Sequence, residues 1–416
     1  MGGRNFTDTF YLVAWTLFLL VVPFYVLGKT PVPQTLHSLQ ANQAELSEKL
    51  ESGVPQLANY IMGLLMAVAL TRIGFRLAPR HVVTVVVFGS FLAYVILINL
   101  AWTTLTLDLS ISKATFFYAY DVVLYVTFLV LYSHFGEQFL RVTMHGVAAS
   151  IFLQVLLSPL AVNLAGFRQC LFFNNPVQLG YYAIAAANIF FVGTQRFRVG
   201  GLYQALFYTG VGYLVVLSLT KACLMALALL GVLALRERPF AVLGGLLVAA
   251  VLVLGSTVVL QDSAPSVIGN LQKRLGTEEA DESVEMRGYD RLVNHPEYLF
   301  FGAGEGAYNR FQSVLRSELH SSYGTLVFCY GVVGAALFTA GLFLACDLRL
   351  KWLISLSPVF LYGLIHHGLR FTLFWVLLAN VCCLARAAGV RSASASVPGL
   401  APAPARQPLR GGWSPP

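Results

Sequence analysis

VVTVVVFGSFLAYVILINLAWT, residues 82–103, contains no charged side chain. A helix of this length rises about 30 Å, which matches the hydrocarbon thickness of a bilayer. The rest of the chain has the same character, because 57% of its 416 residues are hydrophobic, only 11% are charged, and the mean hydropathy is +0.71. These values exclude an ordinary soluble domain, and they predict an all-α, polytopic transmembrane helix bundle.

Apolar runs bounded by charges, proline or glycine recur along the chain, and about 20 residues suffice for each span. The stretch 201–235 is too long for one span and carries Lys221 near its middle. Two helices joined by a tight turn are therefore expected, with Lys221 at a membrane surface. The twelve predicted spans are 8–28, 56–75, 82–103, 116–135, 144–163, 177–195, 201–217, 219–235, 239–260, 321–346, 352–369 and 371–385.

The basic residues predict the orientation of these spans. With both termini in the cytoplasm, the cytoplasmic side carries 15 basic and 4 acidic side chains, whereas the opposite side carries 12 and 15. This asymmetry is the one that spanning helices follow. The net charge of +8 therefore reflects helix orientation, and nucleic acid is not an expected partner.

Residues 1–386 are predicted to form one transmembrane domain, which includes a long, partly helical extracytoplasmic loop at 261–319. A second polar loop, 29–55, is expected to be a connector or to contain a short surface helix. Residues 387–416 are rich in proline, alanine and serine. Such a segment has no means of building a core, so a disordered cytoplasmic tail is expected.

The second half of the long loop reads EMRGYDRLVNHPEYLFFGAGEGAYNRFQSVLRSELH, residues 285–320. Arg287 and Arg291 are four residues apart, so on a helix they share one face and present two guanidinium groups that suit a diphosphate. The alternative is solvated charge paired with neighbouring acids. His320 stands just before the next span, where it is suited to removing a proton near neutral pH. The alternative is an interfacial histidine that caps the helix.

Other features of the sequence carry weaker predictions. GAGEG, residues 302–306, is interpreted as a tight turn whose backbone amides are available for an anion, with Glu305 as a weaker candidate site residue. Asp121 is another weak candidate, because a carboxylate inside a span is costly unless it is paired. The acidic run 278–282 could hold a divalent cation, but a solvated loop face is favoured. No metal ligand cluster and no cofactor motif is found.

These features occur in an order that resembles the O-antigen ligase and O-antigen polymerase family. The arginine pair, HPEYLFFGAGEG (295–306), a histidine followed by a small polar residue, and GVVGAALF (331–338) are similar to its signature region. FFNNPVQLGYY (172–182) and SLTKACLMALALL (218–230) resemble two upstream stretches of that family. The chain differs in having Lys221 where arginine is common, and Ser321 after His320 where asparagine is common.

The resemblance implies an inverting, metal-independent glycosyltransferase of the bacterial inner membrane, without a cofactor and with its active site facing the periplasm. Its donor would be a glycan on undecaprenyl diphosphate, and its acceptor lipid A-core or another glycan. A ligase is favoured, with a polymerase of lipid-linked repeats as the alternative. A transporter or lipid flippase is a more distant alternative, because no pair of interrupted helices is evident.

The resemblance also implies roles for individual residues. His320 would be the base or the group that orients the acceptor hydroxyl, and His366 and His367 are the nearest alternatives in type. Arg370 separates two spans beside these histidines; it would help to bind the diphosphate, or would be a simple charge in a helix turn. The implied ligands of the diphosphate are Arg287, Arg291, Lys221 and Arg370.

Overall fold

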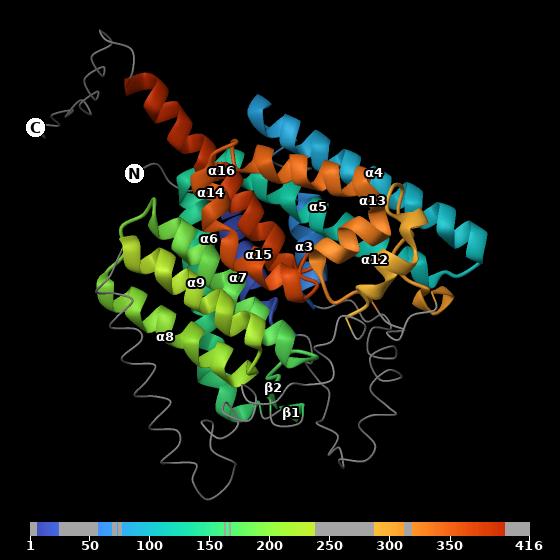
Figure 1. The fold of residues 1–416 in the computed structure, drawn as a ribbon. Coiled ribbons are helices and arrows are strands. Elements are labelled where there is room, and N and C mark those ends of the chain that lie inside the picture. Colours follow the sequence, from blue (N-terminus) through green and yellow to red (C-terminus); the bar gives the residue numbers. More distant parts are fainter. Residues whose placement is uncertain are drawn as a thin grey trace, which may run out of the picture.

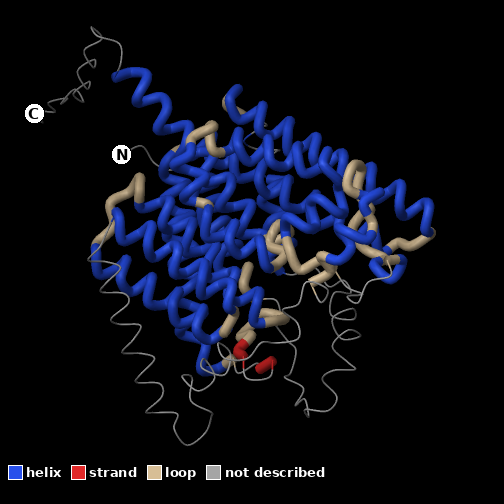
Figure 2. Tube along the Cα trace, viewed as in Figure 1, coloured by secondary structure: helices blue, strands red, loops and turns tan. Residues whose placement is uncertain are grey.

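A computed structural model of the chain describes residues 6–24, 57–68, 73, 77–161, 164–165, 168–237, 287–311 and 318–395. Helices make up most of this part (Figure 2). The prediction of an all-α fold is confirmed for the described residues, with one small exception. β1 (Leu164–Ala165) and β2 (Arg168–Gln169) form a short antiparallel hairpin.

Helices overlap eleven of the twelve predicted spans. The twelfth, 239–260, lies outside the described residues, as do the loop 29–55 and the acidic run 278–282. The longer helices are α1 (Phe6–Val21), α3 (Leu57–Val68), α4 (Pro79–Thr106), α5 (Ser110–Phe135), α6 (Glu137–Leu157), α7 (Pro176–Thr194), α8 (Gly201–Ser218), α9 (Lys221–Glu237), α13 (Ser322–Ala345), α15 (Ser357–Ile365) and α16 (Thr372–Ala395). The shorter ones are η2 (Ser158–Leu160), α12 (Asp290–Asn294), η4 (Pro296–Tyr298), η5 (Tyr308–Arg310) and α14 (Leu350–Ser355).

Six described helices are long and apolar enough to cross a membrane: α4, α5, α6 with η2, α7, α8 and α13. The outer face of α4 exposes large apolar side chains such as Val83, Leu97 and Leu100. A surface of this kind is unfavourable in water and suits contact with lipid. These helices indicate a multi-pass membrane protein, while a total of twelve spans stays a prediction.

Three predicted boundaries are confirmed or corrected by the helix ends. α8 ends at Ser218 and α9 begins at Lys221, which confirms two helices joined by a tight turn. The predicted span 352–369 is instead divided into α14 and α15, because Pro358 lies in the first turn of α15 and has no N–H for a preceding helical turn. The prediction that the disordered tail begins at 387 is also wrong for residues 387–395. These residues are rich in alanine and continue α16.

The centre of the bundle is α7, which packs against α6, α8, α9, α15 and α16 (Figure 1). Nearly every side chain of α7 is buried. Its run of alanines from Ala185 to Ala187 lets neighbouring backbones approach closely, as small residues do in membrane bundles. α16 packs against both α5 and α7 and extends this core.

Ion pairs identify which helix ends lie together. His134, at the end of α5, lies 3.1 Å from Asp8 in α1, and Arg196 after α7 pairs with Glu137 at the start of α6. Residues 287–311 lie at the other end of the bundle, where α4 ends and α5 begins. This end is called the loop end below.

Candidate functional site at the loop end

The loop end is organised by an interruption in α13. Gly331 has φ 65° and ψ −175°, so the helical hydrogen-bond pattern breaks there. Backbone groups released by the break bond to the loop that precedes the helix, which satisfies them inside an apolar protein. These bonds run from Val332 N–H to Leu299 O (2.8 Å), from Ala303 N–H to Phe328 O (2.9 Å) and from Gly304 N–H to Cys329 O (2.9 Å).

Two glycines make this docking possible. A Cβ on Gly331 would lie 2.2 Å from the carbonyl oxygen of Phe300, and a Cβ on Gly302 would lie 2.3 Å from that of Cys329. Both glycines also have positive φ, which side chains disfavour. GAGEG is therefore a turn, as predicted, but one that is built to insert into a broken helix.

The prediction that the amides of this turn are available for an anion is wrong. Besides Ala303 and Gly304, Gly302 donates to Tyr298 O at 2.7 Å, and Glu305 donates to the side-chain oxygen of Asn99 at 3.0 Å. These amides are used to hold the loop. An anion at the loop end would have to be bound by side chains.

The loop is also anchored to the end of α4 by side chains. The Trp102 indole donates to Gly302 O at 3.0 Å, and the Tyr94 hydroxyl donates to Phe301 O at 2.8 Å. Because Asn99 accepts from Glu305, three side chains on α4 fix residues 301–305 in place. The sequence indicated none of these partners, although Asn99 is polar within a strongly apolar run.

Glu305 forms the buried centre of the site and is only 2% exposed. Its Oε1 lies 3.2 Å from Nε of Arg370 and 3.4 Å from Nε2 of His367, and its Oε2 accepts a 2.7 Å hydrogen bond from Tyr330. Arg370 also pairs with Glu318. Glu305, a weaker candidate in the sequence, thus joins the loop to α13 and to the turn before α16.

The charge of Glu305 is stabilised by these contacts. Burial disfavours the carboxylate, but the charge of Arg370 and contacts with His367 and Tyr330 outweigh it and lower the pKa of Glu305 to about 2. On Arg370, burial opposes the charge, and Glu305 and Glu318 overcome it and raise its pKa. Both groups are therefore charged at neutral pH.

Arg291 is fully buried, at 0% exposure, on the short helix α12. Its guanidinium lies over the Tyr308 ring, 5.0 Å from the centroid, and 5.8 Å from the centroid of Phe311. Such contacts stabilise a cation, particularly where water is excluded. Burial lowers the pKa of Arg291 from its ordinary value. Holding this charge inside the loop is costly, which favours a role in binding an anion.

Arg310 is the third arginine of the described stretch 287–311, and it was not among the residues predicted from the sequence. Its guanidinium donates to Ala303 O and Gly304 O and lies 4.8 Å from the centroid of the Trp102 ring. Its Nε and Nη1 are buried and have no hydrogen-bond partner among the described residues. The sequence signal was its position one residue before Phe311, in the same stretch, 287–311, as Arg287 and Arg291.

Arg287 and Arg291 do not share a helix face, so that prediction is wrong. α12 begins at Asp290, and Arg287 lies in the turn before it, where Gly288 has φ 75°. The Arg287 side chain donates to Ile365 O at 3.2 Å, at the end of α15, while Arg291 lies against aromatic rings. The two guanidinium groups thus lie in different surroundings.

His320 stands beside Arg287, because its backbone N–H donates to Arg287 O at 3.2 Å. The following residue, Ser321, caps α13 by accepting from Gly324 N–H at 3.2 Å, and its hydroxyl also donates to Gly363 O. Asparagine and serine are both strong capping residues. Ser321 therefore caps the start of α13 and ties it to the end of α15.

The remaining candidates lie outside the Glu305 cluster or at its edge. Lys221 is half-buried at the first position of α9, and its link to the arginines stays a prediction. Asp121 lies buried within α5, and neither carboxylate oxygen has a hydrogen-bond partner among the described residues. Of the two histidines next to Arg370, it is His367 that contacts Glu305, while the His366 backbone carbonyl accepts from Ser322.

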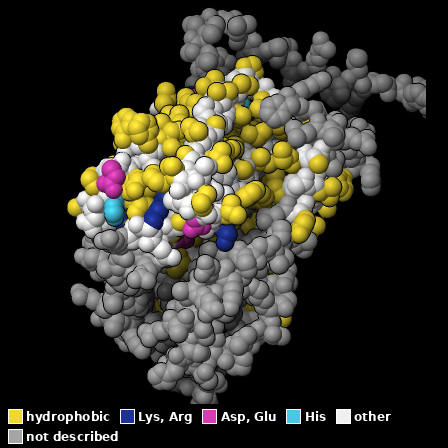
Figure 3. Space-filling model, turned by 90° about the vertical axis from the view of Figure 1, so that its right-hand side faces the viewer, with side chains coloured by type: hydrophobic (Ala, Val, Ile, Leu, Met, Phe, Trp, Pro, Cys, Tyr) yellow, Lys and Arg dark blue, Asp and Glu magenta, His cyan; other side chains and the backbone are white. Residues whose placement is uncertain are grey.

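An apolar groove of about 500 Å³ runs along α13 next to the loop. Its walls come from residues on one face of the helix after the break and from Phe300, five positions before Glu305. The face of the molecule in Figure 3 is likewise mostly apolar among the described residues, with few charged side chains. The groove is lined by Phe300, Val332, Val333, Ala336, Leu337 and Ala340.

Comparison of the chain with models of known protein families and with curated proteins finds no match.

Proposed function

We propose that the protein is a glycosyltransferase that moves a glycan from undecaprenyl diphosphate to an acceptor hydroxyl at the loop end. The observation that carries this proposal is the conjunction of the buried Arg291 and the half-buried Arg310 with an adjoining apolar groove. A polyprenyl diphosphate has the matching parts, namely two negative charges and a long apolar chain. No metal is needed where guanidinium groups supply the positive charge.

The donor would bind across the interruption of α13. Its apolar chain would lie in the groove next to Phe300, which is lined by apolar side chains on one face of α13. Its diphosphate would lie on the loop, toward Arg291 and Arg310, both of which are held by aromatic rings. The break at Gly331 brings these two surfaces together, because it binds the loop directly to the spanning helix.

In the proposed reaction, the acceptor oxygen attacks the anomeric carbon from the side opposite the diphosphate. The bond between the anomeric carbon and the phosphate oxygen breaks, and its electron pair leaves with undecaprenyl diphosphate. His320 accepts the proton of the acceptor hydroxyl. A single displacement of this kind inverts the configuration at the anomeric carbon.

The proposed ligands of the diphosphate differ in how firmly they are held. Arg370 is paired with both Glu305 and Glu318, so its guanidinium is held in a fixed position. It would act on the diphosphate mainly through its positive charge, without a direct hydrogen bond. Arg287 makes one described hydrogen bond, to a backbone carbonyl, and keeps other N–H groups to donate. Lys221 would contribute a point charge from the start of α9.

A transporter is the second candidate, and the interruption of α13 is the observation that favours it, since broken helices are typical of transport sites. Against it, the backbone groups freed at Gly331 are hydrogen-bonded to the loop. The arginines also lie at one end of the bundle, away from the middle of the spanning helices.

Purified protein incubated with an undecaprenyl-diphosphate glycan and two acceptors tests the proposal. A ligase transfers the glycan to lipid A-core, whereas a polymerase lengthens the glycan on a second lipid-linked donor. Lys113→Ala is the matched control, because Lys113 is exposed at the same end, on α5. Transfer by this control and by wild type, with loss in Arg291→Ala, supports the proposal. Absence of any transfer by wild type with both acceptors overturns it.

A further inference from the structure

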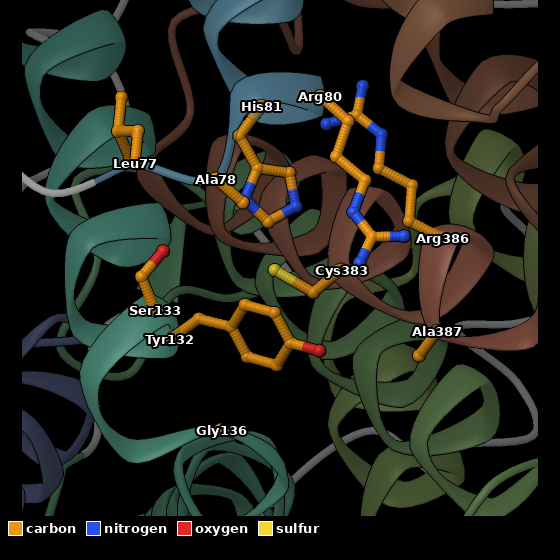
Figure 4. Close-up of a pocket in the computed structure, with 10 residues that line it drawn as sticks. All are labelled: Leu77, Ala78, Arg80, His81, Tyr132, Ser133, Gly136, Cys383, Arg386 and Ala387. Carbon is orange, nitrogen blue, oxygen red and sulfur yellow. The ribbon is translucent and has the colours of Figure 1, made fainter. Parts of the chain in front are cut away.

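A second pocket lies at the end of the bundle opposite the loop end. It has a volume of about 460 Å³ and is formed by the start of α4, the end of α5 and the end of α16 (Figure 4). Arg80, His81, Tyr132, Cys383 and Arg386 are among its lining residues. It has no part in the proposed transfer reaction, because it lies at the start of α4, whereas Glu305 and the loop arginines lie at the other end of that helix.

All the charged side chains that line this pocket are positive. Arg80 and Arg386 both line it, and no acidic side chain is among its lining residues. The acids nearby are engaged elsewhere: Asp8 with His134, Glu137 with Arg196, and Asp347 with Arg349. Two guanidinium groups in one pocket without a facing carboxylate are expected to attract an anion.

Buried polar groups in the pocket have spare hydrogen-bonding capacity. His81 is 3% exposed, and neither ring nitrogen has a hydrogen-bond partner among the described residues. Arg386 is 7% exposed; its Nη2 donates to the Thr84 hydroxyl and to Leu344 O, but its Nη1 has no described partner. Leaving such groups unpaired is costly, and a ligand with acceptor oxygens would remove that cost.

The backbone reinforces this preference for an anion. α4 begins at Pro79, which has no N–H, and the His81 and Val82 amides donate to Ala78 O, so the helix acts on an anion through its dipole and not through these amides. The positive end of a long helix therefore lies at the wall of the pocket, next to Arg80 and His81. Three independent features, namely the arginines, the buried histidine and the helix start, point at the same cavity.

We propose that this pocket binds a phosphate group. Guanidinium forks match phosphate oxygens in geometry, and the imidazole of His81 offers a further donor. The pocket lies where the spanning helix α4 begins, which is the depth of lipid headgroups. An anionic phospholipid such as phosphatidylglycerol brings the phosphate to this depth, and a soluble phosphate ion is the other source of the same chemistry.

The test uses the full chain, purified in a neutral detergent, and measures its thermal unfolding midpoint during titration with phosphatidylglycerol, phosphatidylcholine or inorganic phosphate. Arg80→Gln removes an exposed guanidinium and leaves the Arg386 hydrogen bonds intact, so it is expected to fold. We expect it to weaken binding roughly tenfold, as the loss of one charge-assisted contact does. Arg198→Gln, an exposed arginine at the same end, is the matched control.

Each outcome decides the proposal. Stabilisation by phosphatidylglycerol over phosphatidylcholine, retained in Arg198→Gln and weakened in Arg80→Gln and in His81→Ala, supports a lipid headgroup site. Stabilisation by inorganic phosphate with the same dependence on variants supports a site for the soluble ion. Equal binding of both lipids with no effect of phosphate, or binding in Arg80→Gln that equals wild type, overturns the proposal.

Discussion

Replacing Glu305 by glutamine tests how the loop end is held together. The substitution keeps the size of the side chain and removes its charge. Glu305 is 2% exposed and contacts Arg370, His367 and Tyr330 at 3.2, 3.4 and 2.7 Å. The variant therefore leaves the half-buried Arg370 guanidinium with Glu318 as its one remaining ion-pair partner among the described residues.

The size of the effect follows from burial and charge. Removing one partner of a buried ion pair costs about 3–5 kcal/mol, and the remaining pair with Glu318 favours the lower end. The lowered pKa of Glu305, from 4.5 to about 2, corresponds to about 3 kcal/mol in favour of the folded state at neutral pH. We therefore expect Glu305→Gln to lower the free energy of unfolding by about 3 kcal/mol.

The pH dependence has a defined sign. Because the folded-state pKa is lower than the unfolded one, the stabilisation by Glu305 is fully present above pH 4.5 and is lost as the pH falls toward 2. The difference between wild type and Glu305→Gln should therefore be constant from pH 5 to 7 and should shrink below 4.5. The glutamine variant lacks this dependence.

A double-mutant cycle with Arg370→Gln, measured by unfolding in mixed micelles, isolates the pair. The cycle should give a favourable coupling of about 2–3 kcal/mol, since the two side chains are in direct contact. Glu297→Gln is the control, because Glu297 is exposed and its change should stay within about 0.5 kcal/mol. A coupling near zero, or a glutamine variant as stable as wild type at pH 7, would refute the argument.

Three further predictions concern turnover. Arg291→Ala and Arg287→Ala should each reduce transfer roughly 30- to 150-fold, with partial rescue by lysine, because the charge-assisted interaction of each with the diphosphate contributes about 2–3 kcal/mol. Initial rates beside the Lys113→Ala control check this, and near-normal rates would remove that arginine from the site. His320→Ala should abolish transfer while the free energy of donor binding changes by less than about 1 kcal/mol. Single-turnover transfer and donor affinity measured on one preparation check this. Loss of both transfer and donor binding would instead assign His320 to the diphosphate site. Transfer should survive EDTA, because arginines supply the positive charge; loss that Mg²⁺ restores would contradict a metal-free reaction.

The sequence predicted the helical bundle well because spanning helices leave a strong local signal. The uncharged run that became α4 and the long stretch divided at Lys221 both show this, since bilayer thickness fixes helix length. Boundaries set by other forces were harder to predict. The alanine-rich start of the expected tail joins α16, and Pro358 divides a predicted span, because helix propensity and backbone geometry act there regardless of hydrophobicity.

The sequence indicated which loop holds the candidate site, but it did not indicate which residues of the site contact one another. The loop 287–320, the arginines and His320 were found by their chemistry, since charged and polar groups stand out beside apolar spans. The centrality of Glu305 depends on contacts with Tyr330 and Arg370, which are 25 and 65 positions away, and no local pattern reports such distances. The break at Gly331 was invisible for the same reason, because a glycine in an apolar helix is common and its partner loop lies elsewhere in the chain.

The most direct test of the central claim is the balance between the two products of the proposed reaction. Purified protein would be mixed with a defined undecaprenyl-diphosphate glycan and its acceptor, and both released undecaprenyl diphosphate and transferred glycan would be counted, together with the configuration of the new bond. Our account predicts one undecaprenyl diphosphate for each glycan transferred, with inverted configuration. Movement of the intact lipid-linked glycan across the membrane without release of undecaprenyl diphosphate, or transfer with retained configuration, would contradict it.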